Sequence, residues 1–125
     1  MTNAATSASA RILVVDDDEA VRDAVCDIVT MLGYTAEPAS NACEALDRFR
    51  PGRYDLVVTD LAMPVMNGLQ LARHLRALDP ALPITIFSAT ALSAESALEI
   101  AGITITHKPD IDALARLIQH TLRKS

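Results

Sequence analysis

Short apolar runs alternate with segments of helical periodicity along the chain, and this alternation constrains the fold more than any other feature. Four runs consist of apolar residues, with threonine in three of them, at residues 12–15, 56–59, 84–87 and 103–106. A weaker fifth candidate, residues 34–39, contains Pro38. Continuous apolarity is typical of parallel strands that are covered on both faces, and a proline favours a strand at the edge of the sheet. The runs therefore predict the strands of a parallel sheet.

The segments between the runs carry apolar residues at helical spacing, with capping residues at their ends. We expect five helices. The first runs from a cap at Asp18 to Gly33, the second from Ser40 or Asn41 until Pro51-Gly52, the third from about Gly68 to before Pro80, the fourth from Ser93 to near Gly102, and the last from Asp110. Each apolar run is thus followed by a helix.

A strand followed by a helix, five times over, indicates an α/β fold. Right-handed crossovers then place helices on both faces of one open sheet, which is a doubly wound five-stranded parallel sheet. The 125 residues suit one domain, which we place at residues 11–123. Residues 1–10 have neither the basic start nor the apolar centre of a secretory signal, so we expect a flexible lead-in there.

The composition limits the classes of partner. A formal net charge of −5 argues against a basic face that would bind nucleic acid or an anionic membrane. The apolar runs are also much shorter than the roughly 20 residues that cross a bilayer. We therefore expect a cytoplasmic protein that contacts neither nucleic acid nor membrane directly.

Chemically reactive side chains follow four of the five predicted strands. Asp16 and Asp17 come directly after the first run, and Asp60 after the third. Ser88 ends the fourth, and Lys108 follows the last. The carboxyl ends of parallel strands meet at one edge of the sheet, where ligands bind in open α/β folds. The sequence thus predicts that three carboxylates, a hydroxyl and an ammonium converge there.

Four motifs carry a resemblance to a known family: "ILVVDDDEAVR", "DLVVTDLAMPVMNG", "ITIFSA" and "HKP". Together they resemble the receiver domain of two-component response regulators, from Arg11 to about Arg123. The resemblance implies a flavodoxin-like fold with strand order 2-1-3-4-5. It also implies that a histidine kinase or a phosphotransfer protein transfers a phosphoryl group to Asp60.

The resemblance further implies a Mg²⁺ site. Asp17, Asp60 and the backbone carbonyl of Ala62 would bind the ion directly, and Asp16 would reach it through water; oxygen ligands are those that Mg²⁺ prefers. Lys108 and Ser88 would contact phosphoryl oxygens, because a carboxylate that attacks a phosphoryl group needs cations to offset the repulsion.

The readout end departs from the family pattern. Ile105 occupies the position, three before the lysine, where the family has an aromatic residue that turns inward on activation. Asp110 stands where an apolar residue often follows Lys-Pro, and the segment from Ser88 to Lys108 is a residue or two short. These changes fall on the face that many receivers use to dimerise or to dock an output domain. Our hypothesis is an altered switch or a different partner face.

Other interpretations stay open at this point. Asp60 is also compatible with a solvated strand end, Lys108 with a surface lysine and Ser88 with a cap. A metal-dependent phosphohydrolase could use Asp60 as a covalent nucleophile, but such enzymes in the haloacid dehalogenase style often carry a second acid where this chain has Ala62. A receiver-like module that binds partners without phosphorylation is disfavoured, because every acceptor-site residue is present.

Overall fold

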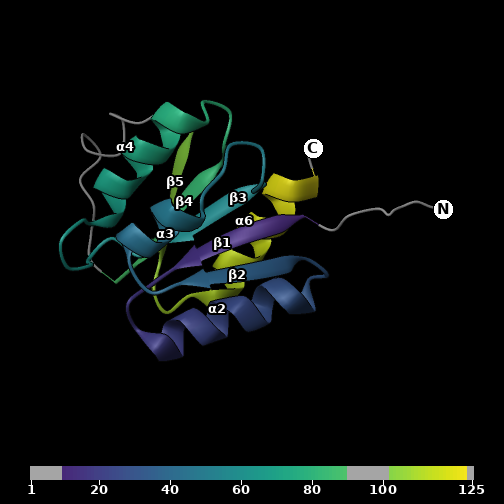
Figure 1. Ribbon diagram of the computed structural model, residues 1–125. Coiled ribbons are helices and arrows are strands. Elements are labelled where there is room, and N and C mark those ends of the chain that lie inside the picture. Colours follow the sequence, from purple (N-terminus) through teal and green to yellow (C-terminus); the bar gives the residue numbers. More distant parts are fainter. Residues whose placement is uncertain (1–9, 90–101, 124–125) are drawn as a thin grey trace.

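The computed structural model describes residues 10–89 and 102–123. Five parallel strands form one sheet in the order β2-β1-β3-β4-β5 (Figure 1). The strands are β1 (Arg11–Val15), β2 (Thr35–Ala39), β3 (Leu56–Thr59), β4 (Ile84–Ser88) and β5 (Ile103–His107). The predicted strand order is confirmed, β2 with its proline lies at an edge, and each strand differs from its predicted run by at most one residue at either end.

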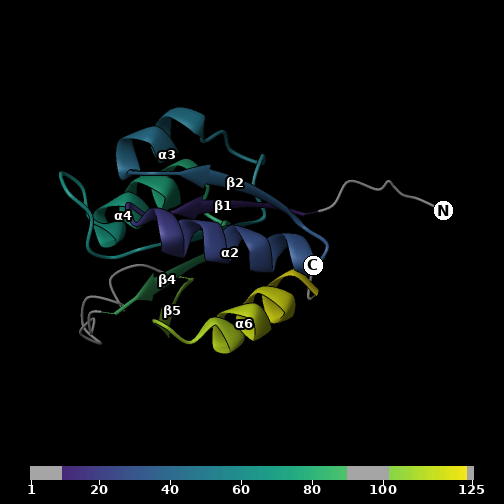
Figure 2. The same ribbon diagram turned by 90° about the horizontal axis from the view of Figure 1, so that it is seen from below.

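Four helices are described, and they cover both faces of the sheet. They are α2 (Glu19–Met31), α3 (Ala42–Arg48), α4 (Gly68–Leu78) and α6 (Ile111–Arg123). Helices α2 and α6 lie together on one face, and α3 and α4 lie on the other (Figures 1 and 2). The doubly wound arrangement is therefore confirmed, while the helix predicted from Ser93 falls largely outside the described residues.

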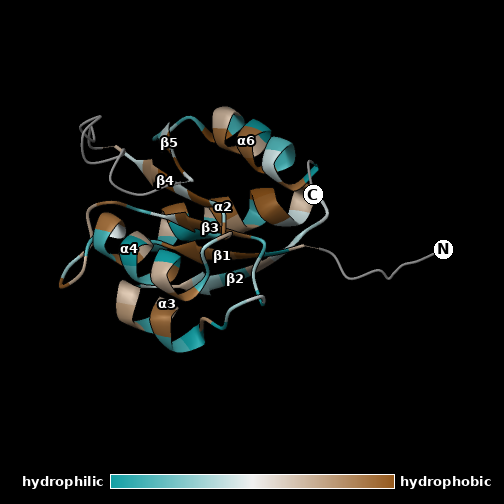
Figure 3. Cartoon of the chain, turned by 90° about the horizontal axis from the view of Figure 1, so that it is seen from above, coloured by the Kyte–Doolittle hydropathy of each residue, from teal (hydrophilic) through white to brown (hydrophobic). Residues whose placement is uncertain are grey.

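Strand β1 shows why the apolar runs are continuous. Leu13 and Val15 pack in the core under α3 and α4, whereas Ile12 and Val14 pack in the core under α2 and α6. All four are at most 1% exposed. Successive side chains of a strand point to opposite faces, so a strand with a core on each side can be apolar at every position. Figure 3 shows β1 in the hydrophobic colour between helices of mixed colour.

The helix ends follow the predicted caps with one correction. Asp18 caps α2 by accepting hydrogen bonds from Ala20 and Val21, and Asn41, not Ser40, caps α3. Helix α3 ends at Arg48, earlier than the predicted stop at Pro51-Gly52, because Phe49 is extended and buried. Among the described residues, no helix is long and apolar enough to cross a membrane.

Candidate functional site

Two backbone hydrogen bonds hold the acidic residues at the carboxyl edge of the sheet. The Asp60 N–H donates to the Val15 carbonyl at 2.9 Å, and the Asp16 N–H donates to the Ala39 carbonyl at 3.1 Å. Strand pairing thus continues one residue past the ends of β1 and β3. As a result, one carboxylate oxygen from each of Asp16, Asp17 and Asp60 lies within 4.8 Å of the others.

Lys108 comes to the same place from the end of β5. Its Nζ lies 2.9 Å from Asp16 Oδ2 and 3.3 Å from Asp60 Oδ1. Both acids are buried, at 3% and 7% exposure. The Lys108 N–H also donates to the Ser88 carbonyl at 2.9 Å, and the Lys108–Pro109 peptide bond is cis. The predicted convergence of three carboxylates and one ammonium is therefore present in the structure.

The environment of the site raises the pKa of both Asp60 and Lys108. Burial raises the pKa of Asp60, and the Asp16 carboxylate raises it further, although Lys108 acts in the opposite direction. Burial alone would lower the pKa of Lys108, but Asp16 and Asp60 together raise it above its ordinary value. The lysine therefore stays charged at neutral pH, and the Asp60 carboxylate is more basic than an ordinary aspartate.

Ser88 and Ala62 lie at the carboxyl edge of the sheet, because Ser88 ends one strand and Ala62 follows another. Ser88 is the last residue of β4, is 1% exposed, and pairs with His107 in the neighbouring strand. Ala62 lies in the loop after β3, two residues beyond Asp60, and is exposed. Their predicted contacts, with a phosphoryl oxygen and with a metal ion, stay predictions.

Sequence reasoning missed the residues that hold the acids in position. Arg22 Nη1 donates to the Asp16 carbonyl at 2.8 Å, and the Asp18 N–H donates to Asp16 Oδ1 at 2.9 Å. A Cβ on Gly68 would lie 2.1 Å from the Asp60 carbonyl oxygen, so only glycine fits there. Gly68 was expected only as a helix start; its contact joins a loop to a helix and has no local signal.

The donor set suits a hard divalent cation. Three carboxylates at this spacing offer the oxygen ligands that Mg²⁺ prefers, and the exposed Asp17 leaves an approach from solvent. Lys108 offsets one of the three negative charges. The arrangement thus combines two buried carboxylates, one exposed carboxylate, one ammonium and a surplus of negative charge that a metal ion would neutralise.

Comparisons with known proteins agree with this geometry. The model of the response regulator receiver domain matches residues 12–119. Response regulator MprA of Mycobacterium bovis (strain BCG / Pasteur 1173P2) is 43% identical over 81 residues, which are 65% of this chain and 35% of that protein. The chain thus spans about a third of the length of the curated relatives it matches.

Solved structures show the same fold. A CheY-like receiver domain protein from Methanospirillum hungatei JF-1 has a TM-score of 0.85 at 28% identity, covering 94% of this chain and 96% of that one. Response regulator TrrA of Thermotoga maritima, in complex with Mg²⁺-BeF, has a TM-score of 0.80 at 31% identity, covering 90% and 98%. With the receiver model matching most of its length, the chain belongs to the receiver domains of response regulators.

Proposed function

We propose that Asp60 accepts a phosphoryl group from a histidine kinase or a phosphotransfer protein, and that this modification changes how the receiver binds its partner. The observation that carries the proposal is the 3.3 Å ion pair between Lys108 and Asp60, beside two further carboxylates. One ammonium needs only one carboxylate to form an ion pair. Three carboxylates around it suit a site that takes up a cation and a phosphoryl group.

The transfer follows from the chemistry of the two partners. An Asp60 carboxylate oxygen would form a bond to phosphorus while the bond from phosphorus to the imidazole nitrogen of the donor phosphohistidine breaks. The imidazole takes the electron pair of that bond. Lys108 would neutralise one phosphoryl oxygen, and the Ser88 hydroxyl would donate a hydrogen bond to another.

The residues that would hold Mg²⁺ are Asp16, Asp17, Asp60 and the backbone carbonyl of Ala62. When bound, Mg²⁺ offsets the negative charge that builds up between the carboxylates and the phosphoryl oxygens. Asp16 also keeps Lys108 in place through their 2.9 Å contact. The same residues would allow the chain to take part in its own phosphorylation from a small phosphodonor and in its dephosphorylation.

An apolar cavity beside Lys108 supports docking of the phosphodonor. Its volume is about 280 Å³, and it is almost wholly apolar. Helix α2 and the start of α6 supply most of its lining, which is Ala20, Val21, Ala24, Phe87, Lys108, Pro109 and Ile111. An apolar side chain of a donor protein would fit here and bring the phosphohistidine to Asp60.

The readout differs from the family pattern at Ile105. This residue is half-buried in β5 and lies opposite Ile86 in the register of the sheet. A branched aliphatic side chain cannot perform the ring movement of an aromatic one, so we propose that an output domain or a second copy reads the phosphorylated state by another change. Sedimentation of the receiver with and without beryllofluoride, a mimic of the phosphoryl group, tests this proposal. A crystal structure of the activated protein that shows the usual dimer of the family would contradict it.

The direct test of the acceptor is incubation with Mg²⁺ and acetyl phosphate, followed by mass spectrometry of the intact protein and its peptides. We expect one added phosphate on the peptide that contains Asp60, and its loss in Asp60→Asn. Asp23→Asn is the matched control, because Asp23 is an exposed aspartate of α2. Phosphate on another residue, or equal labelling of Asp60→Asn, would overturn the proposal.

A further inference from the structure

The strand that leads to the acceptor, β3, carries one buried hydroxyl directly before Asp60. The other residues of the strand are apolar, whereas its last residue, Thr59, is polar and 0% exposed. The Thr59 Oγ1 donates a hydrogen bond to the Asp60 carbonyl at 3.0 Å. Valine has the same branched shape and would fill this position without a polar atom to bury, so packing alone does not require threonine here. The hydroxyl therefore serves its hydrogen-bond partner, which is the backbone of the acceptor.

The next peptide along the chain is held from the other side, by α4. The Gly68 N–H donates to the Leu61 carbonyl at 2.8 Å. A Cβ on Gly68 would lie 2.1 Å from the Asp60 carbonyl oxygen, so the glycine lets α4 approach the same carbonyl that Thr59 contacts. Two consecutive carbonyls after β3 thus have fixed partners, one from the strand and one from the helix.

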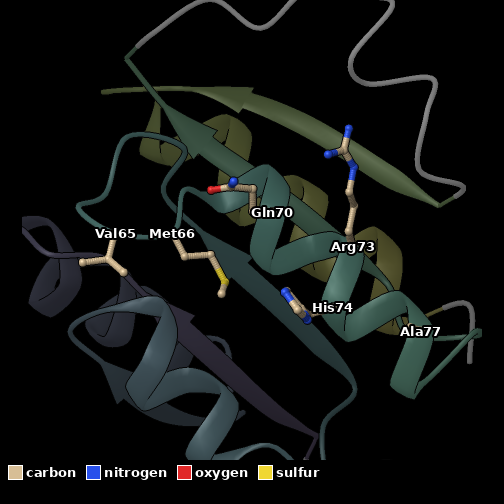
Figure 4. A pocket seen from close by; sticks show the side chains of 6 residues that line it. All are labelled: Val65, Met66, Gln70, Arg73, His74 and Ala77. Atoms are coloured by element: carbon tan, nitrogen blue, oxygen red, sulfur yellow. The ribbon is translucent and has the colours of Figure 1, made fainter.

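The far end of the loop is anchored at the start of α4. The Asn67 side chain accepts from the Gln70 N–H at 2.8 Å, and the Asn67 N–H donates to Gln70 Oε1 at 2.9 Å. Before this cap, the Met66 N–H donates to the Pro64 carbonyl at 2.8 Å around Val65, whose φ is 71°, which makes a tight turn. Figure 4 shows Val65 and Met66 on this loop and Gln70 where it enters the helix. Because the helix end of the loop is fixed, the contacts at its strand end decide how the acceptor is presented.

The peptide between Asp60 and Leu61 connects the Thr59 hydroxyl to the acceptor carboxylate. A peptide unit is planar, so a contact that fixes its carbonyl also fixes the N–H on its opposite side. Burial and Asp16 raise the pKa of Asp60, and the Leu61 N–H acts against them by favouring the charged carboxylate. Rotation of this peptide would move that N–H away from the carboxylate and would change the direction of the carbonyls that follow, including that of Ala62.

We propose that Thr59 is a positioning residue of the acceptor site: its hydroxyl orients the Asp60–Leu61 peptide so that the Asp60 carboxylate and the Ala62 carbonyl are presented together to Mg²⁺. Thr59 acts through the backbone and is not itself a ligand of the ion. This role rests on the proposed phosphoacceptor function, which assigns Asp60 and Ala62 to the metal site. Loss of the hydroxyl should therefore weaken Mg²⁺ binding and slow phosphoryl transfer to Asp60.

The test compares Thr59→Val with Thr85→Val. Thr85 is the matched control, because it lies near the start of β4, is also 0% exposed, and its Oγ1 donates to a backbone carbonyl, that of Thr104, at 3.2 Å. Calorimetric titration with MgCl₂ measures the affinity, and acetyl phosphate labelling measures the rate of transfer. In Thr59→Val we expect about fivefold weaker Mg²⁺ binding and about fivefold slower labelling of Asp60, as for the loss of one hydrogen bond. Thr85→Val should match the wild type in both.

Thr59→Ser separates positioning from packing. Serine keeps the hydroxyl but loses a methyl group, so this variant should unfold at lower urea concentration and still bind Mg²⁺ and accept phosphate as the wild type does. Where Thr59→Val does not fold, Thr59→Ala takes its place, because alanine differs from serine only by the hydroxyl.

Three results would overturn the role of Thr59. They are wild-type Mg²⁺ affinity in Thr59→Val, an equal loss of affinity in Thr85→Val, and a Thr59→Ser protein that binds Mg²⁺ as weakly as Thr59→Val. The affinities are measured without a phosphodonor. Differences in Mg²⁺ affinity as expected, together with no phosphate on Asp60 of the wild type, would support the role of Thr59 and contradict the proposed function, so the two failures are distinguishable.

Discussion

Lys108 Nζ lies 2.9 Å from Asp16 Oδ2, although 92 residues separate the two in the sequence. The same ammonium lies 3.3 Å from Asp60 Oδ1, so one lysine is shared between two buried acids. A bound phosphoryl group on Asp60 would compete with Asp16 for this lysine. The proposed phosphorylation of Asp60 would therefore change the contacts of Lys108 with both acids.

Asp60→Asn is expected to stabilise the metal-free protein at pH 7 by about 1 kcal/mol. Burial and the nearby Asp16 disfavour the charged carboxylate, which is why the pKa of Asp60 is raised. A raised pKa means that wild-type stability falls as the pH rises through that pKa. The two proteins should therefore become equally stable at low pH, below the ordinary pKa of aspartate. Urea unfolding in EDTA across this pH range measures the difference, and a less stable Asn variant at pH 7 would contradict the prediction.

Mg²⁺ is expected to raise the melting temperature of the wild-type protein, because a ligand that binds only the folded state adds about 2.7 kcal/mol at 100 times its Kd. Asp17→Asn should weaken this effect, since it removes the exposed member of the acidic cluster and keeps the buried Asp16–Lys108 pair. Calorimetry over a MgCl₂ titration is the measurement, with Asp23→Asn as the control. A shift of equal size in Asp17→Asn would show that the ion binds elsewhere.

Gly68→Ala is expected to destabilise the protein by about 3 kcal/mol and to slow phosphorylation of Asp60. Its Cβ would lie 2.1 Å from the Asp60 carbonyl oxygen, so the loop that carries the acceptor must move. Gly33→Ala is the comparison: Gly33 has a φ of 94° but open space around it, so strain should cost about 1 kcal/mol and leave phosphorylation unchanged. Unfolding of each variant measures the loss of stability, and labelling with acetyl phosphate measures the phosphorylation of Asp60, so the two effects are determined separately.

Glu37→Gln is expected to lower the free energy of unfolding by about 1 kcal/mol at pH 7. Burial would raise the pKa of Glu37, but hydrogen bonds from Arg11 and Tyr54 and the charge of Arg53 lower it overall. With a lowered pKa, the stabilisation is present above the ordinary pKa of glutamate and is lost as the pH falls through the folded-state value.

Denaturation of Glu37→Gln and wild type from neutral to acidic pH should show the gap closing. Asp27→Asn is the control, because Asp27 lies on the exposed face of α2, and its free energy of unfolding should stay close to that of the wild type. A gap that persists in acid would mean that Glu37 acts through packing rather than charge.

Local patterns in the sequence were sufficient to predict the sheet and the position of the acidic edge. The apolar runs predicted strands with a core on each side, and Asp18 predicted a helix cap. Both predictions were possible because a strand and a cap depend on residues that are neighbours in the sequence. The early end of α3 was not predicted, because it follows from the burial of Phe49 against Tyr54. The two rings are stacked, with their centroids 5.7 Å apart. The support that Arg22 gives to Asp16 was missed for a similar reason: a long side chain reaches back over a turn that the sequence does not specify.

The distance along the chain between Asp16 and Lys108 has a consequence for synthesis. A nascent chain from which β5 has not yet emerged from the ribosome holds its aspartates without their lysine, and the carboxylates repel both one another and an incoming phosphoryl donor. The proposed phosphoryl transfer to Asp60 therefore requires that the last strand of the sheet has been synthesised and has joined it.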